Sequence, residues 1–179
     1  MTPTGHLLTG TAIGVMFMPD YKTRGKKAIH LAVFALLANI PDLPFTNWGH
    51  DRYYFSHSLF VNLLLIGMGI LAIFSYSKIR SQLIPWGVMI GGSISWLSHL
   101  LLDSFYNHGM GIAIFWPFSK ARLILPIPWL AVSTDPFFSI TLKKIQIFLL
   151  EFASFFPLII LAIFIRRAIV FHREVGPTL

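Results

Sequence analysis

The chain has 179 residues, of which 55% are hydrophobic and only 12% are charged. Soluble domains carry about 25% charged residues, so the composition indicates one integral membrane domain spanning residues 1–179. The absence of cysteine excludes disulfides, thiolate metal sites and cysteine nucleophiles, and leaves His and carboxylate side chains as metal ligands. The net charge is +7, but the basic residues form short clusters between apolar runs. That distribution is typical of loops flanking membrane spans, so no nucleic-acid partner is expected.

The first two apolar runs are short or interrupted. Residues 5–18 predict either a tightly fitted span or a re-entrant segment. No Lys or Arg precedes this run and no small-residue cleavage site follows it, so we expect no signal peptide and a retained His6. The second run, 28–46, should form a helix that ends near Ile40, because Pro41 disfavours helical backbone at the preceding residue.

Three further runs, 59–76, 83–105 and 145–165, are each long enough to cross a hydrocarbon core of about 30 Å. The stretch 106–144 differs, because it is rich in proline and aromatic residues and its apolar pieces are too short to span. We expect it to lie over one face as an irregular lid. The predicted fold is therefore an all-α, polytopic transmembrane bundle with four or five spans.

Basic residues predict which ends face the cytoplasm. Lys and Arg gather in the loops 20–27 and 77–82 and in the tail after residue 165. Placing these on the cytoplasmic side makes the spans alternate, although 106–144 then carries basic residues on the outer side. The outward-facing helix ends share one set of polar side chains: His6, Asp42, His57, His99 and Asp103. The reverse topology would collect the same residues on the cytoplasmic side.

His99 and Asp103 are the first candidates for chemistry. They are four residues apart, so on a helix they share one face, about 6 Å apart at Cβ. Polar residues in an apolar helix are costly in lipid and are functional candidates by default. The alternative, a His–Asp pair that only locks two helices together, is equally compatible with this pair alone.

Each of the remaining candidate metal ligands is weak evidence by itself. Together they are stronger evidence, because all of them are expected at the same end of the bundle. Asp42 follows a broken helix end and could be a turn residue, and His57 follows Ser56, a typical N-cap. His6 stands alone near the N-terminus. Three histidines with carboxylates form an accepted set for catalytic zinc or manganese, and additional carboxylates allow a second ion.

Several short motifs occur in a specific order: Gly5-His6, Pro41-Asp42, Ser56-His57-Ser58, His99 with Asp103, and Trp116-Pro117 followed by Arg122 and Pro126. Over roughly residues 1–130 the chain resembles the bacterial inner-membrane family of membrane-bound metal-dependent hydrolases, whose LexA-regulated member is the best-known example. The resemblance implies a bacterial cytoplasmic-membrane location and hydrolysis of an ester or phosphoester, without naming a substrate.

Two positions depart from that family's pattern. Pro44 stands where the family has the second aspartate of a PDxD motif. Arg52 stands where it has a histidine five residues before the one matched by His57. Either His50 fills that role through an altered loop, or one ligand is missing. These departures weaken the prediction of a second metal ion more than the prediction of a first.

We therefore expect a metal-dependent hydrolase whose site lies on the extracytoplasmic side of the cytoplasmic membrane. Zinc is favoured over manganese or iron, with one or two ions bound. The ion would lower the pKa of a bound water to about 7, and Asp42 or Asp103 would accept the proton. Arg122 with Lys120 could bind an amphiphilic, phosphate-bearing substrate, or could instead snorkel to the interface.

Two histidines could support the site without being ligands, namely His50 and His108.

Two other functions could use the same His/Asp cluster. One is a metal or proton transporter, which the sequence disfavours because the opposite helix ends carry only basic loops. The other is a non-catalytic scaffold whose helices are stapled by metal.

Overall fold

The computed structural model describes residues 3–49, 52–80, 84–105, 111–125, 127, 130 and 140–175. Within these residues the fold is all-helical and contains no strand, only one antiparallel bridge between Ile112 and Leu123. The helices, in chain order, are α1 (Pro3–Met16), α2 (Arg24–Leu37), the 3-10 turn η1 (Ile40–Asp42), α3 (Tyr53–Ser56), α4 (Leu59–Arg80), α5 (Trp86–Ser104) and α6 (Leu142–Val175).

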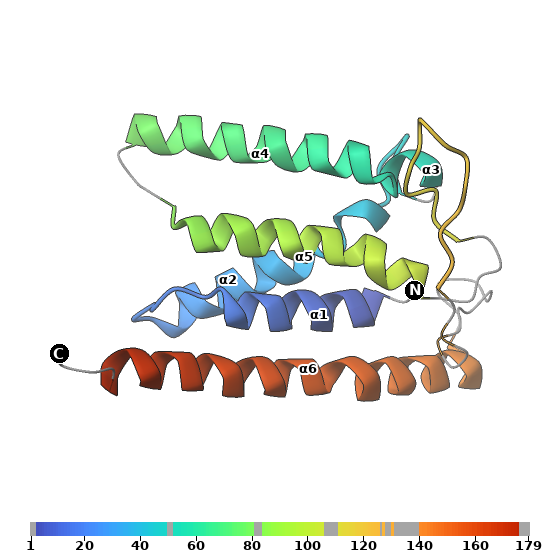
Figure 1. Cartoon of the computed structure of the whole chain (residues 1–179). Coiled ribbons are helices and arrows are strands. Elements are labelled where there is room, and N and C mark those ends of the chain that lie inside the picture. Colours follow the sequence, from blue (N-terminus) through green and yellow to red (C-terminus); the bar gives the residue numbers. More distant parts are fainter. Residues whose placement is uncertain are drawn as a thin grey trace.

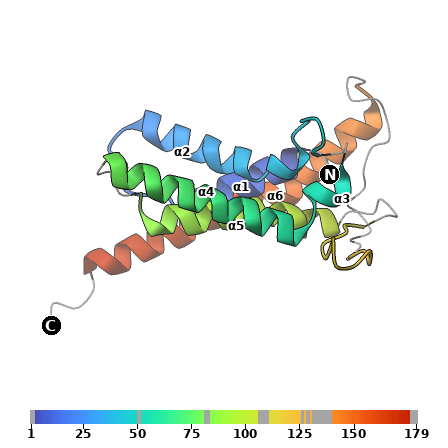
Figure 2. The same ribbon diagram turned by 90° about the horizontal axis from the view of Figure 1, so that it is seen from above.

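The long helices run side by side, with α1 packed against α2, α5 and α6, and with α4 on the outer side of α5 (Figures 1 and 2). Close approach depends on small residues along α1. A Cβ atom at Gly10 would lie 2.6 Å from the carbonyl oxygen of Phe34, and one at Gly14 would lie 2.9 Å from the Phe34 side chain. Glycine at these positions allows α1 to contact α2 directly.

In the described part of the chain, two helices have the length and composition of membrane spans, namely Leu59–Ile79 of α4 and Leu142–Phe171 of α6. Only 11% and 17% of their most apolar windows are buried within the protein. A core helix of a soluble protein would be mostly buried, whereas these two present large apolar side chains outward, including Leu64, Leu71 and Phe164. Exposed apolar surface of this extent indicates lipid contact.

Several helix boundaries differ from those expected from hydropathy. Helix α2 begins at Arg24, because the side chain of Thr23 caps it by accepting from Lys26 N at 3.4 Å. Arg24, Lys26 and Lys27, from the predicted loop 20–27, therefore lie in its first turn, and Lys22 precedes it. Helix α6 exceeds the predicted range 145–165 at both ends, because helical hydrogen bonding continues through the charged residues that flank the apolar core.

Residues 111–125 form the irregular segment expected of a lid, at the end of the bundle where α4 begins and α5 ends (Figure 1). Backbone hydrogen bonds attach it to both helices. Leu59 N donates to Ile114 O at 2.9 Å, and Leu125 N donates to Ser104 O at 2.7 Å. The segment is thus fixed at the end of the bundle that holds the predicted polar residues.

Candidate metal centre

His99 is held by a backbone carbonyl from the neighbouring helix. Its ring is fully buried, and its Nδ1 lies 2.8 Å from the oxygen of Ala38, just beyond α2. A carbonyl can only accept a hydrogen bond, so Nδ1 carries the proton. In the neutral ring, Nε2 then presents a lone pair, and it lies 3.5 Å from Asp103 Oδ2 one turn along α5.

Asp42 reaches the same point from the 3-10 turn that follows α2. The turn forms because Pro41 ends the helical pattern and because Trp48 Nε1 donates to Ile40 O at 2.7 Å, which folds the following loop back. Asp42 Oδ1 lies 3.3 Å from His57 Nε2 and 3.6 Å from His99 Nε2. The broken helix end therefore delivers a carboxylate to the centre, as its place in the sequence predicts.

His57 lies between α3 and α4 and is oriented by its own turn. Its Nδ1 lies 3.2 Å from Tyr53 O and 2.8 Å from Ser56 Oγ, while Ser56 Oγ donates to Gly49 O at 3.0 Å. Nδ1 is therefore the donor, and Nε2 again faces inward with a lone pair. It lies 3.1 Å from Asp103 Oδ2 and 3.2 Å from His99 Nε2.

His6 enters from α1. Its ring stacks on that of His99 with centroids 3.8 Å apart, and its Nε2 lies 3.3 Å from Asp103 Oδ1. Neither ring nitrogen forms a hydrogen bond with any residue that the structure describes, although the ring is fully buried. A buried imidazole without hydrogen bonds costs about 1–3 kcal/mol per unsatisfied group, and a bound cation at Nε2 would offset part of that cost.

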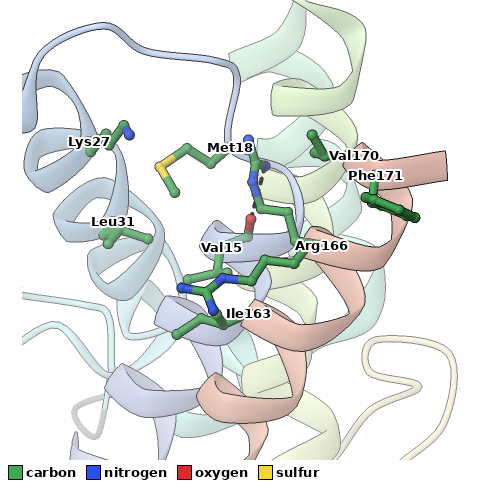
Figure 3. Close-up of a pocket in the computed structure, with 9 residues that line it drawn as sticks. Val15, Met18, Lys27, Leu31, Ile163, Arg166, Val170 and Phe171 are labelled. Atoms are coloured by element: carbon green, nitrogen blue, oxygen red, sulfur yellow. Dashed lines mark hydrogen bonds between the residues drawn. The ribbon is translucent and has the colours of Figure 1, made fainter. Parts of the chain in front are cut away.

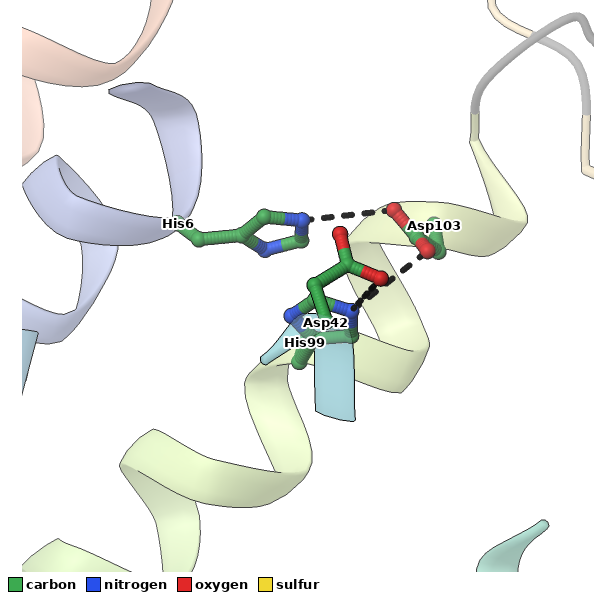
Figure 4. Close-up of side chains that lie close together, drawn as sticks. All are labelled: His6, Asp42, His99 and Asp103. Atoms are coloured by element: carbon green, nitrogen blue, oxygen red, sulfur yellow. Dashed lines mark ion pairs between the residues drawn. The ribbon is translucent and has the colours of Figure 1, made fainter. Parts of the chain in front are cut away.

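The geometry of the whole cluster fits a divalent cation. Ligand atoms of His6, Asp42, His99 and Asp103 lie within 4.8 Å of one another (Figure 4), and His57 Nε2 is in contact with the last three. Atoms that bind one ion at about 2.0–2.2 Å are separated by roughly 2.8–3.6 Å along the edges of an octahedron or tetrahedron. The neighbouring pairs here lie at 3.1–3.6 Å.

The charges of the cluster lead to the same conclusion. The Nε2 lone pairs of His57 and His99 face each other, and they also face the carboxylates of Asp42 and Asp103. All of these groups are hydrogen-bond acceptors, which repel one another at such distances unless positive charge lies between them. A proton can bridge one such pair, whereas a central divalent ion satisfies all of them at once. Hydrogen bonds from the outer ring nitrogens to backbone carbonyls are also the usual second contact of metal-binding histidines.

The comparison with known families places this cluster in a membrane context. The sequence matches the YdjM inner membrane protein family over residues 1–172. The chain belongs to that family. No curated protein and no solved structure shows significant similarity to it. Family membership establishes this YdjM-family chain as an inner membrane protein, and it names no reaction.

Arg122 and Lys120, predicted to bind substrate, lie on the segment 111–125 of this YdjM-family protein rather than in the cluster. Arg122 donates to Gly111 O at 3.3 Å and to the Tyr54 hydroxyl, and its guanidinium lies 4.6 Å from the Tyr54 ring centroid. Lys120 is exposed. Arg122 is thus held in one orientation beside α3, and Lys120 points to the surface.

Two residues near the cluster were not identified as site residues from the sequence. The Tyr53 ring stacks on His57 with centroids 3.9 Å apart, and burial together with the charges of Asp103 and Asp42 raises the pKa of its phenol, so the hydroxyl stays protonated. Glu151 is buried in α6 and accepts a hydrogen bond from Gly5 N at 3.2 Å. Its position as the only charged residue of 145–165 was the available signal.

The two histidines predicted to support the site, His50 and His108, lie outside the described residues. Pro44, at the position of the family's second aspartate, is exposed on the loop after η1. That position therefore supplies no carboxylate to the cluster, which leaves Asp42 and Asp103 as the acidic residues that the described part of the chain brings together.

Proposed function

We propose that this YdjM-family protein is a multi-pass, metal-dependent hydrolase that cleaves an ester or phosphoester of an amphiphilic substrate at the membrane surface. The observation that carries the proposal is the convergence of His6, Asp42, His57, His99 and Asp103, all buried except the partly exposed Asp42, from α1, η1, the α3–α4 junction and α5 at one end of the bundle. Buried side chains of this kind are expensive to retain in a membrane protein and serve function far more often than stability.

The multi-pass arrangement is supported by the shorter helices as well as by α4 and α6. Helix α5 has 19 residues and is about 28 Å long, and α1 and α2 have 14 residues each, about 21 Å. Helix α2 also presents Ile29, Val33 and Leu36 outward. Helix α5 comes close to the hydrocarbon thickness of about 30 Å, whereas α1 and α2 fall short of it and would have to sit in a locally thinner bilayer or enter it only in part. Counting α5 and these shorter helices with α4 and α6 gives the proposed four or five membrane-inserted helices.

Asp42 is the better candidate for general base. Its side chain is 16% exposed, compared with 2% for Asp103, so a proton accepted there can pass to solvent. A divalent ion, zinc before manganese or iron, would supply Lewis acidity and lower the pKa of water near the carboxylate. The four residues His6, His57, His99 and Asp103 would hold it, with one ion expected since Pro44 replaces the second family aspartate.

An anionic, lipid-like substrate fits the surroundings of the cluster. The segment that carries Arg122 and Lys120 is attached to the same end of the bundle, and Arg122 is already oriented by Tyr54. Guanidinium groups bind phosphate through short, charge-assisted hydrogen bonds. A substrate whose tail remained in the bilayer could then present its phosphoester to the centre.

A transporter is the main competing function, and packing in the middle of the bundle disfavours it. Ala12, Val15 and Ala162 form a buried apolar cluster between α1 and α6, with Leu31 and Ile159 packed against it. A transport path through this region would need polar groups along its length. Between α1 and α6 the described residues place this apolar cluster instead, and the buried polar side chains of His30 and Ser95 are bonded to the backbone carbonyls of Gly14 and Phe34.

Turnover by the purified protein tests the proposal. The protein would be stripped with chelator, reloaded with zinc or manganese, and incubated with phospholipids and lipid phosphates in mixed micelles, with release of phosphate or of the water-soluble headgroup as the readout. Metal-dependent release that His99→Ala abolishes is the expected result. Bound metal without turnover, together with metal or proton uptake into proteoliposomes, would establish the transporter instead, and bound metal with neither would establish the scaffold.

A further inference from the structure

A second polar feature lies at the opposite end of the bundle from the metal centre. A cavity of about 560 Å³ opens between α1, α2 and α6 (Figure 3). This volume falls within the range of roughly 300–1,000 Å³ typical of small-molecule sites. Along α1, Val15 at the cavity is nine residues from His6, which corresponds to about 14 Å. The cavity is therefore separate from the His/Asp cluster.

The walls of the cavity combine two kinds of side chain. Three are cationic: Lys27, Arg166 and Arg167. The others are apolar: Val15, Met18, Leu31, Ile163, Val170 and Phe171. A lining that combines cationic and apolar side chains matches an amphiphile better than it matches a soluble anion.

The three cationic side chains differ in how many hydrogen bonds and ion pairs they form within the protein. Arg166 donates to Val15 O at 3.1 Å and pairs with the exposed Asp20 at 3.2 Å, so much of its capacity is used in joining α6 to α1. Lys27 and Arg167 are exposed, and no hydrogen bond or ion pair joins either of their side chains to another described residue. Their positive charge is available to a ligand.

The apolar wall continues onto the surface that contacts lipid. Ile163 and Phe171 line the cavity and are also exposed on the outside of α6, 37% and 61% respectively. The cavity thus opens towards the acyl chains while its cations lie at the end of the bundle rich in Lys and Arg. Basic pockets between spans at such an interface bind the headgroups of anionic lipids.

From these observations we infer that the cavity between α1, α2 and α6 binds one anionic phospholipid, with the phosphate between Lys27 and Arg167 and the acyl chains along Leu31 and Ile163, one turn nearer the middle of the bundle. The site is independent of the proposed hydrolase activity. The lipid is not a substrate there, because the cavity contains no carboxylate or imidazole among its lining residues.

The test uses the full-length protein in nanodiscs of phosphatidylcholine containing a graded fraction of phosphatidylglycerol, with lipid retained after mild detergent extraction measured by native mass spectrometry. The variant Lys27→Gln/Arg167→Gln should weaken retention of phosphatidylglycerol by about fivefold per lost charge, or about 25-fold in total. The matched control, Lys26→Gln/Lys78→Gln, removes the same charge from exposed positions outside the cavity and should retain the lipid like the parent protein.

A second variant separates shape from charge. Val170→Trp fills the apolar wall and keeps every cation, so it should also reduce phosphatidylglycerol retention. Equal loss in the Lys26→Gln/Lys78→Gln control would show only general surface attraction and would overturn the proposal. Displacement of the lipid by millimolar inorganic phosphate would also overturn it, since the site would then recognise a free anion. Circular dichroism of each variant confirms that the helices are intact.

Discussion

The Nδ1 of His99 donates a hydrogen bond to the carbonyl oxygen of Ala38 at 2.8 Å, and this contact between α5 and the end of α2 fixes which nitrogen faces the carboxylates. A second buried histidine, His30, provides a comparison within the same chain. Its Nε2 donates to Gly14 O at 3.0 Å, and its Nδ1 lies 3.4 Å from the Tyr21 hydroxyl. Both rings are buried and bonded to backbone, but only His99 faces acidic side chains.

The first prediction follows from that comparison. His99→Ala should remove bound metal from the purified, folded protein, because it deletes a ligand and leaves Asp42 and Asp103 facing each other without it. The loss of affinity should exceed the 10–100-fold typical of residues that only support a ligand. His30→Ala removes a buried histidine of similar packing and should keep the metal. Elemental analysis of both proteins, with circular dichroism as the folding control, distinguishes the two; retention of full metal content by folded His99→Ala would exclude it from the ligand set.

The sequence predicts that the side chains of the His/Asp cluster lie at one end of the bundle, but it does not predict how they are oriented. The four-residue spacing of His99 and Asp103 and the proline after Ile40 are local signals, and they place each residue at a helix end. The hydrogen bond from His99 Nδ1 to Ala38 O and the stacking of Tyr53 on His57 depend on how α5, α2 and α3 pack. Packing of this kind involves residues far apart in the chain, and no single-sequence pattern encodes it.

The second prediction concerns Glu151. Its carboxylate accepts from Gly5 N, the residue before His6, and so positions the first turn of α1. Glu151→Leu should reduce metal affinity by about 10–100-fold, as loss of a supporting partner does. Glu151→Gln retains an acceptor oxygen and should recover most of the affinity. Competition with a chromogenic chelator measures both; equal affinity in the Leu and Gln variants would show that the hydrogen bond to Gly5 has no part in positioning His6.

The helix lengths show a different limit of sequence interpretation. Hydropathy predicts the apolar centres of α4 and α6 but not their ends, because basic residues such as Lys143, Lys144 and Arg166 interrupt the apolar pattern and are typical of loops. The helix continues through them, and Arg166 turns back to donate to Val15 O. Long basic side chains can extend along a helix towards the interface, so charge alone does not mark a helix end.

The third prediction tests the close packing of α1 on α2. Gly10→Ala would place a Cβ 2.6 Å from Phe34 O, a backbone atom, so α1 must move outward and carry His6 with it. We expect destabilisation of about 1–3 kcal/mol from overpacking and weaker metal binding. Gly67→Ala in α4, where nothing lies within 4 Å of the added atom, should be neutral or stabilising. A lower Tm for Gly67→Ala than for Gly10→Ala would contradict the packing argument.

The fourth prediction separates substrate binding from metal binding. Arg122→Ala should leave the metal content unchanged, since Arg122 bonds to Gly111 O and Tyr54 rather than to the cluster. If it binds an anionic substrate, KM should rise while kcat changes little, because a contact common to ground state and transition state is lost. Tyr54→Phe removes the hydroxyl partner but keeps the guanidinium, and should raise KM less. Loss of metal from folded Arg122→Ala would place Arg122 in the centre instead.

The last prediction concerns the side of the membrane on which the site lies. The chain has no cysteine, so single cysteines can serve as probes without background labelling. Phe45→Cys lies on the loop after η1, next to the metal centre, at a position that is 61% exposed, and Lys78→Cys lies on the exposed face at the other end of α4. Basic residues favour the cytoplasm for the Lys78 end. A membrane-impermeant maleimide applied to spheroplasts should therefore label Phe45→Cys and not Lys78→Cys, and should label both after lysis. The reverse pattern would place the metal centre on the cytoplasmic side and would exclude a periplasmic substrate, and equal labelling of both before lysis would contradict a crossing by α4.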